Sequence, residues 1–105
     1  MQVMDFWEVP INVVGTVRSP KWQTVRLHHL AANSECICCG KVDDLEVHHI
    51  KSVGQHPELE LVPDNLATLC ERCHLVVAHL NNWHKINPNI IEDSALLRSR
   101  HIKTP

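Results

Sequence analysis

Residues 36–40 read CICCG and residues 70–74 read CERCH, so the chain carries two Cys-x-x-Cys pairs. This spacing lets both thiolates of a pair bind one ion, and four thiolates close a tetrahedral zinc site with bonds of about 2.3 Å. Gly40 suits the reversed backbone turn of a tight knuckle. Iron can occupy a similar four-sulfur site. The alternative without a metal is four buried free thiols. The predicted ligands of a structural Zn²⁺ are Cys36, Cys39, Cys70 and Cys73.

The size and composition of the chain make a metal cross-link useful. With 105 residues it is expected to form one domain with a modest core, and only 4% of the residues are aromatic. The count of five cysteines is odd and the N-terminus lacks signal-peptide features, so reduced thiols are favoured over disulfides. Cys38 is expected to point away from the metal. No apolar run approaches the roughly 20 residues that span a bilayer, so we expect no membrane partner.

Local patterns outline the secondary structure. β-branched residues at 11–17 indicate a strand, and Ser19-Pro20 is typical of a helix start. The helix predicted after the second knuckle has Val76 and Leu80 pointing inward. The predicted elements are a strand at 11–17, a helix from 19 to about 32, a strand at 45–50, a loop at 51–64, a helix at 70–81 and a last helix from 89 to about 101.

The chain between the two knuckles is too long for a plain zinc ribbon. Its 30 residues exceed the usual spacing of about 15–20, and they contain LEVHHI at 45–50 and PDNLATL at 63–69, with His74 after the last cysteine. These motifs resemble the HNH endonuclease family. That family places His or Asp followed by His on a strand, Asn just before the second knuckle and His directly after its last Cys. The resemblance covers roughly residues 18–93.

The resemblance implies a fold as well as a chemistry. It implies an α+β fold, a small zinc-stapled ββα-metal (treble-clef-like) domain with flanking helices. The chain then divides into an N-terminal arm at 1–18 and an HNH nuclease domain with a C-terminal helix at 19–105. A catalytic divalent ion would be clamped between strand and helix. We expect the protein to be cytoplasmic, in a bacterial host or a phage-infected cell.

Phosphodiester hydrolysis needs a base to take a proton from water and a cation to neutralise the charge that grows on the phosphate, which suggests roles for the residues that carry the resemblance. Neutral imidazole suits the base near neutral pH, and His49 is assigned this role. His48 and His74 would bind the catalytic ion, and Asn65 would orient the base or complete the metal shell. Adjacent strand residues face opposite sides, so His48 and His49 share one site only at a strand end or bulge.

The identity of the catalytic ion stays open among Mg²⁺, Mn²⁺, Ni²⁺ and Zn²⁺. The family often has Asp where this chain has His48, and imidazole favours zinc, nickel or manganese over magnesium.

His74 could instead be a fourth ligand of the structural zinc, and Asn65 could simply cap a turn. We expect His79, His56 and His84 to lie outside the site. Of these three, His79 is the first candidate to belong to it. Basic residues that could touch phosphate are Arg18, Lys21, Arg26, Lys51, Arg72 and Lys85.

The resemblance therefore implies a metal-dependent endonuclease, which we expect to cleave DNA one strand at a time. The resemblance implies 5′-phosphate and 3′-hydroxyl products. A net charge of −2 is poor for long-range steering, so we expect weak intrinsic affinity and a shallow salt dependence. A competing hypothesis is a non-catalytic zinc module that binds nucleic acid or protein. A third is an accessory nuclease of a larger assembly, such as phage DNA packaging or a mobile element, with a partner protein or second protomer.

Overall fold

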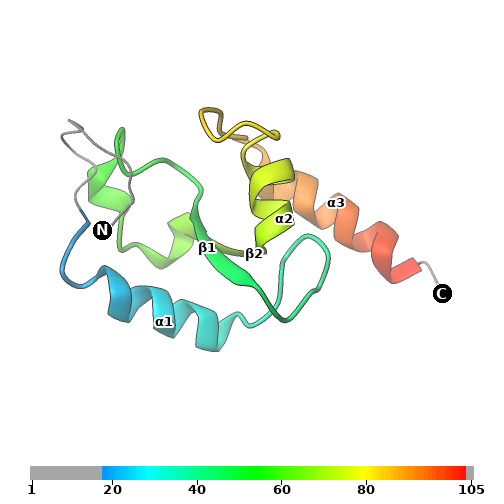
Figure 1. The fold of residues 1–105 in the computed structure, drawn as a ribbon, viewed down its shortest axis with the longest axis horizontal. Coiled ribbons are helices and arrows are strands. Elements are labelled where there is room, and N and C mark those ends of the chain that lie inside the picture. Colours follow the sequence, from blue (N-terminus) through cyan, green and yellow to red (C-terminus); the bar gives the residue numbers. More distant parts are fainter. Residues whose placement is uncertain (1–17, 104–105) are drawn as a thin grey trace.

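A two-stranded antiparallel sheet separates the helices of the chain into two groups. The computed structural model describes residues 18–103, with side chains described for 18–100. Helix α1 lies on one side of the sheet, and α2, η3 and α3 lie on the other (Figure 1). The predicted strand at 11–17 and most of the predicted arm at 1–18 lie outside the described residues. The elements are α1 (Trp22–Ala32), β1 (Leu45–His49), the 3-10 turns η1 (Pro57–Leu59) and η2 (Pro63–Asn65), β2 (Leu66–Cys70), α2 (Glu71–Cys73), the π-helix η3 (His74–Ala78) and α3 (Ile90–Lys103).

The register of the sheet decides which side chains meet the helices. Leu45 pairs with Cys70 and His49 pairs with Leu66, so both strands are paired along their whole length. Successive side chains alternate between faces. His49 therefore faces α1, where its ring lies 4.4 Å from that of Trp22, and His48 faces η3. The predicted α+β fold class is confirmed.

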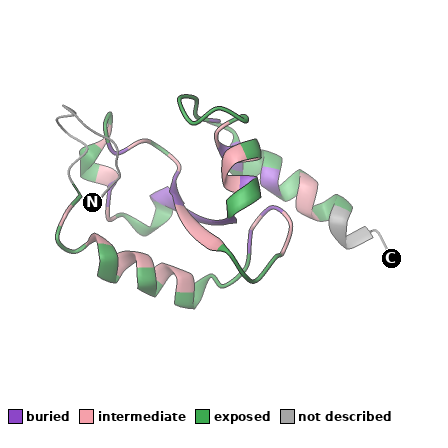
Figure 2. Cartoon of the chain, viewed as in Figure 1, coloured by how far each residue is buried: buried purple, intermediate pink, exposed green. Residues whose placement is uncertain are grey.

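The described core is small and sulfur-rich. Buried residues gather on β2, at the first knuckle and where η3 meets α3, whereas α1 is exposed or half-buried along its length (Figure 2). Only two of the five largest fully buried side chains, Leu69 and Ile90, are long aliphatic ones. A core of this kind removes little apolar surface from water, and each buried methylene contributes only about 0.8 kcal/mol. The buried cluster is Cys36, Cys38, Leu69, Cys70, Cys73, Ala78 and Ile90.

The helix predicted at 70–81 is wrong in its limits and in its inward face. Cys70 ends β2, a single α-helical turn follows, and the chain then continues as a π-helix that ends at Ala78. Val76 and Leu80 are 45% and 49% exposed, while Ala78 is fully buried and Val77 packs against the core. The prediction assumed α-helical periodicity. The π-helix bonds residue i to i+5, which rotates the following residues to other faces.

The loop between the strands is closed by the side chain of Asn65. Its Oδ1 accepts a hydrogen bond of 2.8 Å from the Lys51 backbone N–H, and its Nδ2 donates to the carbonyls of Lys51 and Leu59. The Asn65 backbone carbonyl also accepts from Ile50 N–H. The residue is buried, so these backbone groups have little access to water as an alternative partner. Asn65 therefore holds the two ends of the loop at 50–65 together.

We predict that Asn65→Ala lowers the free energy of unfolding by about 1–3 kcal/mol, because truncation removes three hydrogen bonds and leaves the Lys51 N–H without its acceptor. Urea unfolding of the metal-loaded protein measures this change. Asn33→Ala, which removes one exposed side-chain bond to the His29 carbonyl, is the matched control and should change stability much less. Equal effects of the two substitutions would show that the loop does not depend on Asn65.

Candidate active site

Four cysteine side chains from two distant parts of the chain meet at one point. The Sγ atoms of Cys36, Cys39, Cys70 and Cys73 all lie within 4.8 Å of one another, and all four cysteines are free thiols. The Cys39 and Cys70 sulfurs are 3.8 Å apart. Sulfurs at about 2.3 Å from a tetrahedral zinc are separated by about 3.8 Å, so donor type, number and spacing fit a structural metal. His74 groups with other histidines and is not part of this cluster.

The local backbone of each knuckle favours thiolates. Backbone N–H groups donate to the Cys36 sulfur from Cys38 and to the Cys70 sulfur from Cys73. Burial raises the pKa of Cys36, but hydrogen bonds from the neighbouring knuckle backbone outweigh it and lower the pKa to about 7. Burial raises the pKa of Cys73. A bound cation is what favours four thiolates together, because coordination deprotonates a thiol.

Helix α3 supports the first knuckle through one arginine. Arg98 donates from Nη1 to the Cys36 carbonyl at 3.2 Å and pairs through Nη2 with Glu35 at 2.6 Å. Its guanidinium lies against Gly40, where a Cβ would stand 2.9 Å from Arg98 Cζ. Gly40 also has a φ of 81°, so a side chain there meets both backbone strain and a steric clash. The sequence indicated the turn at Gly40 but gave no sign of Arg98.

Three histidines form a second cluster on the other side of the knuckle. The ring nitrogens of His48, His74 and His79 lie within 4.8 Å of one another. His48 comes from β1, and the other two stand at the start and just past the end of η3. His48 Nδ1 and His74 Nε2 are 3.2 Å apart. His79, expected outside the site, lies in this cluster, because its ring is as close to the other two as they are to each other.

Hydrogen bonds fix the tautomers of two of these rings. His74 Nδ1 lies 2.6 Å from a Glu46 carboxylate oxygen, which can only accept when ionised, so Nδ1 carries the proton. His79 Nδ1 likewise donates to the Lys85 carbonyl at 2.7 Å. In the neutral form of each ring, the lone pair is therefore on Nε2, the nitrogen that does not face Glu46 or Lys85. Partners of this kind orient metal-binding histidines in many proteins, so the donor set fits a divalent ion.

The π-helix is what brings His74 and His79 together. Its turn is closed by the bond from His79 N–H to the His74 carbonyl, five residues apart. An α-helix places residues three or four apart on one face, so this pair would diverge there. Asn87 stabilises the turn from outside, because its backbone N–H donates to the Ala78 carbonyl and its side chain to that of Val77. Insertions of this type occur often at functional sites.

His49 occupies a different environment from the adjacent His48. Its Nε2 donates to the Glu60 carbonyl at 2.9 Å, which leaves the lone pair of the neutral ring on Nδ1. Burial lowers the pKa of His49 to about 4, with the Arg18 charge adding to the effect. Burial also lowers the pKa of His48 to about 3, assisted by the neighbouring histidines. Both rings are thus neutral at neutral pH.

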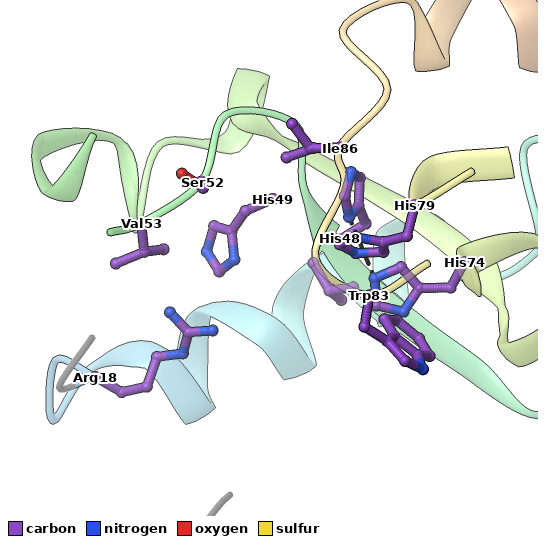
Figure 3. Close-up of a pocket in the computed structure, with 10 residues that line it drawn as sticks. Arg18, His48, His49, Ser52, Val53, His74, His79, Trp83 and Ile86 are labelled. Carbon is purple, nitrogen blue, oxygen red and sulfur yellow. Dashed lines mark hydrogen bonds between the residues drawn. The ribbon is translucent and has the colours of Figure 1, made fainter. Parts of the chain in front are cut away.

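The two environments open into one pocket of about 270 Å³. In Figure 3, His49 lies between the Arg18 side chain and the histidine cluster, and Trp83 lies beside the cluster. β1 ends at His49, which lets neighbours with opposite orientations line the same pocket. Asn65 does not line it, so a place for its amide in the metal shell is not supported. His56 and His84 are also absent from the lining.

The comparison with protein families agrees with this geometry. The HNH endonuclease family matches residues 36–79, which run from the first knuckle through the histidine cluster. The resemblance predicted from the sequence is thus confirmed as a match over these residues. Neither the comparison with curated proteins nor that with solved structures gave a significant match. In residues 18–103 no helix has the length and apolar character needed to cross a membrane.

We predict that the purified chain holds one metal ion tightly through its cysteines and that Cys73→Ala unfolds it. Structural zinc contributes on the order of 10 kcal/mol to small domains, more than the modest core of this chain can replace. Elemental analysis and circular dichroism measure the two effects. Cys38→Ala is the matched control, because Cys38 is equally part of the buried cluster but lies outside the four-sulfur group. A metal-free chain that stays folded would contradict the prediction.

Proposed function

We propose that this chain is a metal-dependent endonuclease that hydrolyses phosphodiester bonds in DNA. The observation that carries the proposal is the meeting, in one pocket, of three imidazoles with a neutral His49. The match of residues 36–79 to a family of endonucleases supports the same chemistry. A non-catalytic zinc module would need the four cysteines but none of these histidines.

The two clusters would hold two different ions. The cysteine cluster suits a structural Zn²⁺, and the ligands of the catalytic ion would be His48 and His74, joined by His79. Three neutral imidazoles favour Zn²⁺, Ni²⁺ or Mn²⁺ over Mg²⁺. The catalytic ion would supply positive charge to the phosphate and to the leaving oxygen. His48 Nδ1 and His74 Nε2 form a hydrogen bond of 3.2 Å, so an ion bound by both nitrogens would take the place of the proton between them.

His49 would act as the general base. Its Nδ1 is the ring nitrogen free to take a proton from water, whose oxygen attacks phosphorus as the P–O3′ bond breaks. The 3′ oxygen leaves with a proton from solvent, which gives 5′-phosphate and 3′-hydroxyl ends. The low pKa keeps the ring neutral before substrate binds. An anionic phosphate in the pocket would raise this pKa and thereby strengthen the base, since a nearby negative charge favours imidazolium.

Residues around the base would position it. The Glu60 carbonyl fixes the ring, and the Glu60 carboxylate accepts from Ser19 N–H at 2.9 Å, which ties the start of α1 to the same residue. Trp22 covers the other side of the His49 ring. Asn65 closes the loop that carries Glu60. Arg18 lines the pocket and is the basic residue best placed to meet a phosphate there.

We predict that His49→Ala abolishes nicking of supercoiled plasmid while metal content and thermal midpoint stay close to those of the unmodified chain. The reason is that His49 binds neither cluster and would act only in proton transfer. The assay covers a panel of divalent ions, and His28→Ala, an exposed histidine on α1, is the control that should keep full activity. Retained cleavage in His49→Ala would move the base elsewhere. Absence of cleavage by the unmodified chain with every ion would favour the non-catalytic module.

We predict that His79→Ala weakens binding of the catalytic ion and that high metal concentration partly restores cleavage. Removing one of three ligands should leave the cysteine cluster loaded. Glu46→Ala is the graded companion, because it removes only the carboxylate that orients His74, and loss of such a partner costs about 10–100-fold in metal affinity. Calorimetric titration of the zinc-loaded protein with Mn²⁺ or Ni²⁺ gives both affinities. Unchanged affinity in His79→Ala would remove it from the ligand set.

A further inference from the structure

Trp83 is a large exposed aromatic side chain beside the histidine cluster, and neither cluster uses it. Its ring centroid lies 5.2 Å from that of His74 and 4.9 Å from that of His79, and it lines the same pocket. Even so, 55% of its surface remains in solvent. The nearby Ile86 also lines the pocket and is partly exposed. The wall of the pocket beside the cluster is therefore apolar and open.

The loop that carries Trp83 is an ordered turn held by hydrogen bonds. Leu80 and Asn81 both have positive φ, 54° and 63°, which reverses the chain directly after the π-helix. Positive φ is unfavourable for a residue such as Leu, so the surrounding contacts must hold it. Asn82 accepts from His84 N–H through Oδ1 and from Lys85 N–H through its carbonyl. The Lys85 carbonyl accepts from His79, so the loop and the cluster fix each other.

The charge of the chain makes an uncharged contact with substrate useful. A net charge of −2 gives little attraction for a polyanion. A fixed, exposed indole offers stacking instead, which every nucleobase can accept because each has a flat face. Bases inside a duplex already stack on their neighbours, and freeing one costs a few kcal/mol. An unpaired nucleotide offers its face without that cost.

We propose that Trp83 stacks on an unpaired nucleobase next to the cleaved phosphate, so that single-stranded or locally unpaired DNA is the preferred substrate. This inference rests on the proposed nuclease function. Trp83 is then a specificity residue: it selects the state of the strand and is indifferent to base identity. The pocket position of the ring beside His74 and His79 places the stacked base within one nucleotide of the reacting group.

The test compares oligonucleotides of one sequence as single strand, as duplex and as single strands with one abasic nucleotide placed at successive positions. The metal-loaded protein should cleave the single strand faster than the duplex. One abasic position beside the cleaved bond should lower kcat/KM by about 5- to 150-fold, the range expected for loss of one base–aromatic stack. Trp83→Ala should lower kcat/KM on the intact single strand by a similar factor and lose nothing further at that abasic position. Trp83→Phe should keep most of the activity.

A purely structural role for Trp83 predicts a different pattern. It would weaken Mn²⁺ or Ni²⁺ binding in Trp83→Ala and lower cleavage of every substrate equally, which would overturn the proposal. Preference of the unmodified chain for duplex, or an abasic penalty that persists in Trp83→Ala, would also overturn it. Leu96→Ala is the matched control, because Leu96 is equally exposed at 55% but lies on α3 away from the pocket.

Binding separates this inference from the nuclease function itself. Single-strand affinity measured on His49→Ala needs no cleavage, and it should fall when Trp83→Ala is added to that variant. The fall should vanish with the oligonucleotide that is abasic at the critical position. If the unmodified chain cleaves nothing, the nuclease proposal fails while this binding result still decides whether Trp83 stacks on a base.

Discussion

The convergence of four sulfurs is the constraint on which the rest of the fold depends. Two segments that are 30 residues apart in sequence meet there, and few large apolar side chains support the junction. His74 follows Cys73 directly, so the position of the first knuckle relative to β2 also sets the position of the histidine cluster. Stability and chemistry are thus supplied by adjacent residues of one short segment. A metal bound by the cysteines would therefore also hold the histidines after Cys73 in place relative to β1.

The helical geometry after Cys73 brings the histidines of the second cluster together. The change from α to π hydrogen bonding aligns His74 with His79 and turns Val76 outward. Glu46 and the Lys85 carbonyl then set the tautomers of the two neutral imidazoles. On the far face of β1, Glu60 does the same for His49. Three acceptors that cannot donate therefore determine which nitrogen of each neutral ring remains free, and β1 directs His49 and His48 to opposite faces.

The parts of this site that depend on local spacing are predictable from the sequence. The four cysteines, His48 and His74 lie in short motifs whose spacing reflects their geometry. Nothing in the sequence groups His79 with His74, because a separation of five residues diverges in an α-helix, and the π-turn depends on Asn87, which binds it from outside the helix. Glu46 carried a usable signal, since residues two apart on a strand share a face. Asn65 was recognised, but the partners of its amide follow from how the loop closes.

The Asn87 side chain also reaches in the other direction, where it donates to Asp93 in the first turn of α3 at 2.8 Å. One amide therefore joins the π-helix to a helix that contributes no ligand. Local opening of α3 would break the bond to Asp93 and free the Asn87 amide, which would weaken its hold on Val77 in the turn that aligns His79. Ion occupancy at the histidines and docking of α3 are then thermodynamically linked, as for any ligand that binds only the closed form. Amide hydrogens of α3 would exchange more slowly with the ion bound, although the helix never touches it.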